Sequence, residues 1–186
     1  MIYNVKNVYK KYHNNMIINN FNYSFSSGLY LLIGRNGIGK STLLKIMAKI
    51  ISPSNINFSV DKIKVSYMCE KIELVNTKPS SFLKTICKIN KRKSDIKKDL
   101  DIWKVPNRKI NNLSKGNKQK VAILMMKYTD ADLYLFDEPT DSLDKDGLVL
   151  FSEFIKELLK NEKIVVISTH EPSYFSTIAY KEISLC

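Results

Sequence analysis

A glycine-rich stretch at residues 34–41, with the sequence GRNGIGKS, matches the phosphate-binding pattern G-x-x-x-x-G-K-[ST]. It directly follows an apolar run and directly precedes a helical pattern, which is the context that this pattern requires. Glycines let the backbone curl until successive N–H groups point at phosphate oxygens, and the positive end of the helix dipole adds to the attraction. The residues expected at the phosphates are Gly34, Asn36, Gly37, Gly39, Lys40, Ser41 and Thr42.

An apolar run at residues 133–136 ends in two adjacent acids, Asp137 and Glu138. A carboxylate at the C-terminal end of a strand can hold Mg²⁺, and the acid after it is turned toward an attacking nucleophile. We therefore expect Asp137 and the hydroxyl of Ser41 to bind Mg²⁺, while Lys40 reaches the β- and γ-phosphates. Two adjacent acids also occur at ordinary strand-end turns, and the phosphate loop is what favours a catalytic pair.

Three apolar runs, at residues 29–33, 133–136 and 164–167, are too short for buried helices and show no alternation. They predict central strands of a parallel sheet that is covered on both faces. Apolar residues recur at intervals of three and four over residues 43–51 and 151–159, which predicts amphipathic helices. Strands that alternate with helices indicate an α/β fold, with a mostly parallel sheet and helices on both of its faces.

Two other segments do not follow this alternation. Residues 2–8 and 17–25 predict short antiparallel strands around a turn at residues 13–15, and hence a small N-terminal antiparallel β subdomain. Residues 78–112 begin with Pro-Ser-Ser and predict a short inserted helical lobe. The basic stretch in this lobe, at residues 88–93, is either a solvated helix face or a docking surface.

Between the phosphate loop and the two acids, residues 113–117 read LSKGN and open a helical pattern. Here the chain resembles the ATP-binding cassette (ABC) ATPases, whose signature helix begins with an LSGGQ-like sequence upstream of the acidic strand. Ser114 and Gly116 match this signature, whereas Lys115 and Asn117 depart from it. Lysine in the first glycine place is familiar in cassettes paired with bacterial export or drug-resistance membrane subunits, so the resemblance favours an exporter.

Other motifs of the family follow in the family's order. Residues 139–144 resemble the D-loop, in which Asp144 would contact a partner cassette. His170, at the end of a predicted strand, resembles the switch histidine. Tyr12 matches the aromatic residue that stacks on adenine, with Tyr9 as a rival, and the resemblance extends over nearly the whole chain.

The resemblance implies a single RecA-like ABC nucleotide-binding domain over residues 1–186, with its ATP-binding core at residues 1–77 and 113–186. It also implies ATP and Mg²⁺ as cofactors. Two cassettes of this family sandwich each nucleotide between the phosphate loop of one chain and the signature motif of the other. Glu138 would then polarise the attacking water, and His170 would contact the γ-phosphate.

One position departs from the family. Glu70 stands where cassette ATPases carry the Q-loop glutamine, and Gln119 in the signature helix is the only glutamine of the chain. A carboxylate can ligate Mg²⁺, but it cannot donate an amide hydrogen bond and it adds negative charge near the γ-phosphate. We expect Glu70 to be a metal ligand; the alternative is that it points into solvent.

The formal net charge is +12, and residues 1–100 hold 18 basic against 5 acidic side chains. This asymmetry indicates either an anionic partner or compositional drift. No apolar run approaches the roughly 18 residues of a membrane helix, and the N-terminus lacks the apolar stretch of a signal peptide. Cys69, Cys87 and Cys186 form neither metal-spaced pairs nor an even disulfide set, so we expect a reducing cytosol.

The leading hypothesis is an ATP-binding and ATP-hydrolysing subunit that powers a membrane transporter whose membrane-spanning part is a separate chain. The expected partners are a second ABC cassette, identical or different, and a transmembrane permease subunit, with no nucleic acid. The expected location is cytoplasmic, peripheral on the inner face of the cell membrane. The alternatives are a soluble ABC-type ATPase acting on nucleic acid or ribosomes, and an ATP-gated regulatory module with little hydrolysis.

Overall fold

A five-stranded parallel sheet with the strand order β5-β6-β7-β3-β8 runs through the middle of the molecule. The computed structural model describes residues 1–185, so Cys186 lies outside the described residues. The three strands predicted from the sequence are β3, β6 and β7, and each prediction agrees within one residue at either end. The strands are β3 (Gly28–Ile33), β5 (Val65–Met68), β6 (Leu133–Asp137), β7 (Ile164–Ser168) and β8 (Tyr180–Ser184).

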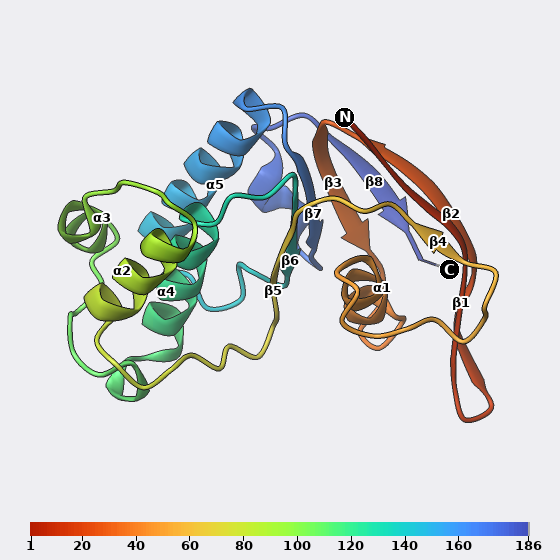
Figure 1. Ribbon diagram of the computed structural model, residues 1–186, viewed down its shortest axis with the longest axis horizontal. Coiled ribbons are helices and arrows are strands. Elements are labelled where there is room, and N and C mark those ends of the chain that lie inside the picture. Colours follow the sequence, from red (N-terminus) through yellow and green to blue (C-terminus); the bar gives the residue numbers. More distant parts are fainter. Residues whose placement is uncertain (186) are drawn as a thin grey trace.

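Helices cover both faces of this sheet, as predicted, with α1 on one face and α4 and α5 on the other (Figure 1). They are α1 (Lys40–Met47), α4 (Lys115–Lys127) and α5 (Lys145–Lys160). Alternate residues of a strand serve the two faces. In β3, Leu29 and Leu31 pack in the core shared with α4 and α5, while Tyr30 and Leu32 pack in the core shared with α1. Both faces are therefore buried, which explains the unbroken apolar runs in the sequence.

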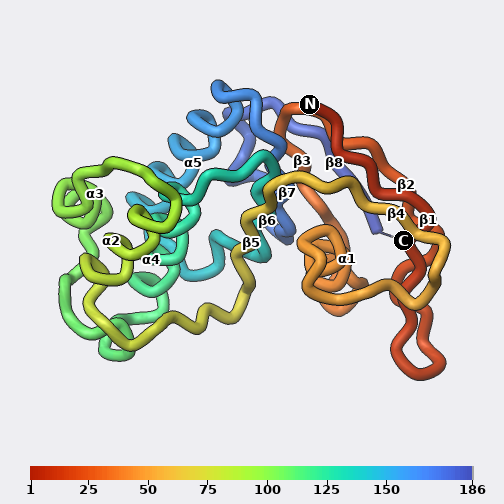
Figure 2. Tube along the Cα trace, in the orientation of Figure 1, coloured from red at the N-terminus to blue at the C-terminus, as the bar shows by residue number. Residues whose placement is uncertain are grey.

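The small N-terminal sheet has the order β2-β1-β4 and covers the outer side of α1 (Figure 1). Its strands are β1 (Ile2–Tyr12), β2 (Asn15–Ser26) and β4 (Ser59–Val60). The predicted antiparallel pairing is confirmed, but the prediction of short strands is wrong, since β1 and β2 have 11 and 12 residues. Asparagine would ordinarily end a strand, but here Asn7 and Asn20 lie at β-bulges and the strands continue. They adopt φ of 55° and 50° where the register between β1 and β2 shifts. The resulting hairpin projects beyond the rest of the chain (Figure 2).

The segment predicted as a helical lobe packs on the outer side of α4 (Figure 1). It contains α2 (Pro79–Ile89), α3 (Ile96–Ile102) and a 3₁₀ turn, η1 (Ile110–Asn112). Leu83 of α2, Leu100 of α3 and Trp103 belong to the same buried cluster as one face of the parallel sheet. The lobe is also fastened by Asp99, whose Oδ1 lies 2.9 Å from Lys127 Nζ and whose Oδ2 accepts a hydrogen bond from Tyr128.

The lobe therefore shares a core with the sheet, and the division into core and lobe drawn from the sequence stays a prediction. Among residues 1–185, the structure shows no helix with both the length and the apolar character needed to cross a membrane.

The shared core predicts that the lobe unfolds together with the sheet. Leu83→Ala removes a fully buried side chain and should lower the free energy of unfolding by about 2–5 kcal/mol. Urea titration followed by far-UV circular dichroism and by fluorescence of Trp103, the single tryptophan, should give coincident transitions. Thr85→Ala, on the exposed side of the same helix, is the control. A separate, earlier fluorescence transition would show that the lobe has its own core.

Candidate active site

A cavity of about 330 Å³ lies at the start of α1, beside the C-terminal ends of β6 and β7. This is the edge at which ligands bind in open α/β sheets. Its lining consists of Asn36, Gly37, Gly39, Lys40, Ser41, Thr42, Glu70, Glu138, Asp141 and His170. The sequence predicted all of these as site residues except Asp141.

The phosphate loop depends on backbone conformations that favour glycine. Gly37 and Gly39 have φ of 80° and 115°. A Cβ at Gly39 would lie 2.7 Å from the Cγ2 atom of Ile17 on β2, so the loop packs directly against the N-terminal sheet. Gly39 precedes the first residue of α1 and brings no capping side chain, which leaves the first N–H groups of the helix available to a ligand.

The ammonium group of Lys40 is held inside this loop, with 6% of the residue exposed. Its Nζ donates a hydrogen bond to the Gly34 carbonyl at 2.8 Å and lies 3.5 Å from Glu138 Oε1. A buried charge is costly unless it is paired, and these two contacts compensate the charge of Lys40. They also hold its side chain in place in the lining of the cavity. The phosphate loop and the acid after β6 are thus joined by one ion pair.

Asp137 is 1% exposed and receives hydrogen bonds from three hydroxyl groups. Ser41 and Ser168 donate to Oδ1 at 3.0 and 2.7 Å, and Tyr67 donates to Oδ2 at 3.1 Å. Burial, and then the charge of Asp137, raise the pKa of the Tyr67 hydroxyl, so it keeps its proton and remains a donor. Ser41 lines the cavity, and its oxygen lies 3.0 Å from Oδ1 of the buried Asp137; these two hard ligands form a donor set that fits Mg²⁺.

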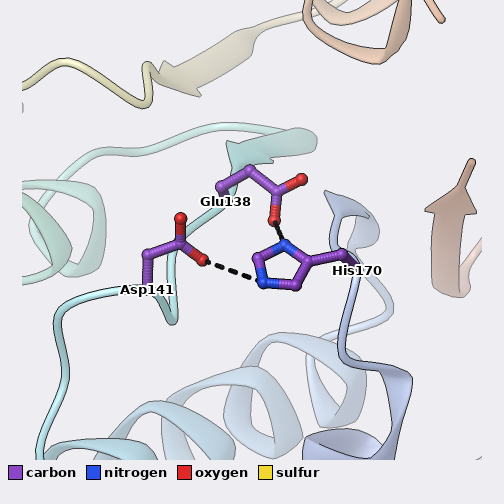
Figure 3. A group of neighbouring side chains, drawn as sticks. All are labelled: Glu138, Asp141 and His170. Atoms are coloured by element: carbon purple, nitrogen blue, oxygen red, sulfur yellow. Dashed lines mark hydrogen bonds and ion pairs between the residues drawn. The ribbon is translucent and has the colours of Figure 1, made fainter. Parts of the chain in front are cut away.

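Glu138 and His170 face each other from the loops after β6 and β7, and Asp141 approaches the same imidazole ring (Figure 3). His170 Nδ1 lies 3.1 Å from Glu138 Oε2, and His170 Nε2 lies 4.0 Å from Asp141 Oδ1. Glu138 has a left-handed backbone with φ of 47°, and its N–H donates to the side-chain and main-chain oxygens of Ser168 at 3.0 and 3.2 Å. Because β6 and β7 are neighbours, these bonds fix the acid at the strand end.

Glu70 also lines the cavity, and it has no hydrogen bond or ion pair with any other part of the chain that the structure describes. Tyr12 is not in the lining. It ends β1, near the tip of the projecting hairpin, is 46% exposed and has Lys10 Nζ 5.1 Å from its ring centroid. The predicted contact of Tyr12 with adenine therefore stays a prediction.

Five other predicted site residues are not in the cavity lining. The Gly34 carbonyl accepts the hydrogen bond from Lys40, and Asp137 is buried next to Ser41. The remaining three are Ser114, Asp144 and Gly116. Ser114 caps α4 by accepting a hydrogen bond from the Asn117 N–H at 3.2 Å. Asp144 caps α5 and pairs with Lys120, its Oδ2 lying 2.9 Å from Nζ. A Cβ on Gly116 would lie 2.5 Å from the main-chain oxygen of Ser142, in the loop after β6. This close packing is by itself a sufficient reason for glycine at position 116.

Sequence reasoning missed Tyr67, Ser168 and Asp141. Their side chains face the site because their strands or loops border β6. Two of them lie beside motifs: Ser168 directly precedes the Thr-His pair of the switch motif, and Asp141 lies within the D-loop segment at residues 139–144, whereas no local pattern marks Tyr67.

Comparison with known proteins gives a consistent assignment. The family model described as "ABC transporter" matches residues 18–141. The chain is 29% identical over 206 residues to the high-affinity zinc uptake system ATP-binding protein ZnuC of Bacillus subtilis, covering 97% of this chain and 89% of that protein. It is 31% identical over 177 residues to an uncharacterized ABC transporter ATP-binding protein of Methanocaldococcus jannaschii, MJ1023, covering 90% of this chain and 67% of that protein.

Among solved structures, the ATP-binding cassette MJ0796, a dimer in a post-hydrolysis state with ADP and Pi, superimposes with a TM-score of 0.84 at 22% identity. The match covers 100% of this chain and 94% of that one, and it shows that the fold is shared. Together with the family match over residues 18–141, these findings establish that the chain belongs to the ABC transporter family and is an ATPase of that family.

Proposed function

We propose that this chain is the ATP-hydrolysing subunit of a membrane transporter whose membrane-spanning part is a separate chain. The observation that carries the proposal is the cavity in which the phosphate loop, the acids after β6 and the switch histidine meet. The direction of transport is a separate question. Lys115 in the signature motif favours export, whereas the relative ZnuC is named for uptake, so the proposal of export rests on Lys115 alone.

The chemistry assigned to these residues is mainly positional and electrostatic. The N–H groups of Asn36, Gly37 and Gly39 bind phosphate oxygens, and Thr42 contacts the α-phosphate. Lys40 exchanges its ion pair with Glu138 for the β- and γ-phosphates.

This exchange frees the Glu138 carboxylate to accept a hydrogen bond from the attacking water, while His170 contacts the γ-phosphate. Ser41 and Asp137 would hold Mg²⁺, with Glu70 of the same cavity lining as a further ligand, and the metal would supply positive charge that neutralises the phosphates.

The partner in hydrolysis is a second cassette. Ser114 and Gly116 do not line the cavity that contains their own Lys40, which supports a head-to-tail pair in which they reach the nucleotide of the other chain. In this pair Asp144 contacts the partner cassette, and Tyr12 stacks on the adenine. ATP then joins the two chains, and its hydrolysis weakens the dimer.

Glu138→Gln tests this function directly. The variant keeps the side-chain shape but loses the base that orients water, so it should bind ATP, lose most turnover and accumulate as a dimer with ATP on a sizing column. Lys40→Ala is the matched control, because it should lose ATP binding and remain monomeric. Full turnover by Glu138→Gln, measured with the membrane partner present, would overturn the assignment.

Glu70→Gln tests the one departure from the family's site. Since Glu70 adds a negative charge to the lining of the phosphate cavity, the amide should preserve or raise ATPase activity and weaken the dependence on Mg²⁺ concentration. Lys71→Gln, beside it in sequence and outside this cavity, controls for surface charge. A hundredfold loss of activity in Glu70→Gln would show that the carboxylate is essential.

The permease would dock on the lobe, where two hollows flank α2. An apolar hollow of about 290 Å³ includes Phe82 and Ile86 of this helix together with side chains of β5 and α4. A basic hollow on the other side includes Lys84 and Lys88. The occupant proposed for the apolar hollow is a helix of the membrane-spanning chain. The basic hollow would face anionic headgroups at the inner surface of the membrane, each cation adding about 1 kcal/mol.

Phe82→Glu places a charge in the apolar hollow and should abolish co-purification with a multi-span membrane protein expressed from the neighbouring reading frames. Ile89→Glu, exposed on the same helix and outside the hollow, should leave it intact. Undiminished co-purification of Phe82→Glu would place the contact elsewhere. A chain that stays in the cytosol with all its neighbours co-expressed, and binds RNA or DNA tightly at physiological salt, would be the soluble alternative.

A further inference from the structure

Two carboxylates face the imidazole of His170, and only one of them has a role in the proposed chemistry. Glu138 Oε2 lies 3.1 Å from Nδ1, within hydrogen-bond distance, whereas Asp141 Oδ1 lies 4.0 Å from Nε2 (Figure 3). The His170 side chain is 56% exposed, so packing does little to fix its orientation. Among residues 1–185, these two acids are the polar contacts of the ring.

The Asp141 side chain makes no hydrogen bond that stabilises the fold in the part of the chain that the structure describes. Its side chain is 32% exposed, and within the described chain its one ion-pair partner is His170. Asp144, in the same loop, differs because it caps α5 and pairs with Lys120. A carboxylate that lines a triphosphate cavity also repels its ligand, so Asp141 carries an electrostatic cost for nucleotide binding.

We propose that Asp141 is a positioning residue for His170: before nucleotide binds, its charge attracts the Nε2 edge across 4.0 Å, so that the Nδ1 edge stays on Glu138 and the ring stays turned into the cavity that the γ-phosphate enters. This inference rests on the proposed ATPase site. If Lys40 leaves Glu138 for the phosphates, the His170 contact is the remaining constraint on that carboxylate, and a ring free to rotate into solvent would release it. Asp141 thereby presents the acid and the imidazole together to the incoming nucleotide.

The test is steady-state ATPase kinetics of the full chain with its membrane partner. Asp141→Asn removes the charge while keeping the size of the side chain, and kcat should fall about fivefold, the scale of a partly exposed ion pair. KM for ATP should stay equal or decrease, because a negative charge has left the cavity. Asp146→Asn is the control, since Asp146 pairs with Lys104 and does not line the cavity, and it should match the unmodified protein. A raised KM with unchanged kcat would overturn the proposal.

A double-mutant cycle separates positioning from a general structural effect. In a His170→Ala background, Asp141→Asn should no longer change kcat. A further fivefold loss there would show that Asp141 acts without His170. If Glu138→Gln and His170→Ala are themselves without effect on turnover, the proposed function fails; if they lose turnover and Asp141→Asn does not, only this inference fails.

A second readout does not depend on activity. The chain has two histidines, His13 in the hairpin turn and His170, so its imidazole NMR signals are readily assigned by His170→Ala. Asp141→Asn should shift the His170 ring signals toward those of a freely rotating side chain and leave those of His13 in place. Unchanged His170 signals would contradict the proposal even in a variant too slow for kinetics.

Discussion

The buried charge of Asp137 is the constraint on which the site depends. A carboxylate that is 1% exposed must be compensated by hydrogen bonds, since leaving it unpaired would cost several kcal/mol. The hydroxyl donors come from three elements: Ser41 in α1, Tyr67 on β5 and Ser168 on β7. These elements surround β6, so a single charge fixes the phosphate loop against the strand that ends in Asp137 and leads into Glu138. The proposed metal ligands are thereby held in place by the same bonds that stabilise the C-terminal edge of the sheet.

The ion pair between Lys40 and Glu138 follows from that arrangement. With Asp137 satisfied by hydroxyl groups, Glu138 is the acid that lies within 3.5 Å of the buried ammonium. Phosphate oxygens compete for the same ammonium, so nucleotide binding would change the partners of Glu138 without moving the backbone. The electrostatic groups are already oriented before the ligand arrives, which is the condition under which they lower a barrier most effectively.

The sequence predicted β3, β6 and β7 because both faces of these strands are buried, and the motifs predicted most of the cavity lining. It missed β8, where Ile183 is the one buried residue of the strand and the apolar run is absent. The hairpin was predicted too short because asparagine bulges are not a strand signal. Tyr67 and Ser168 were missed because their hydroxyls reach Asp137 only through the strand order β5-β6-β7, which periodicity does not encode.

The loop that carries Glu138, the proposed catalytic acid, also contacts the start of α4. Gln119 Nε2 donates to the Pro139 carbonyl at 2.7 Å, and a Cβ at Gly116 would lie 2.5 Å from the Ser142 carbonyl. One side-chain hydrogen bond and one close approach of two main chains therefore connect the signature motif to the segment that follows Glu138. In the proposed dimer, this signature motif serves the other chain's nucleotide. A shift of the segment after Glu138 would then also shift the signature motif that contacts the other chain's nucleotide. The two nucleotide sites of the proposed dimer would be coupled through this packing.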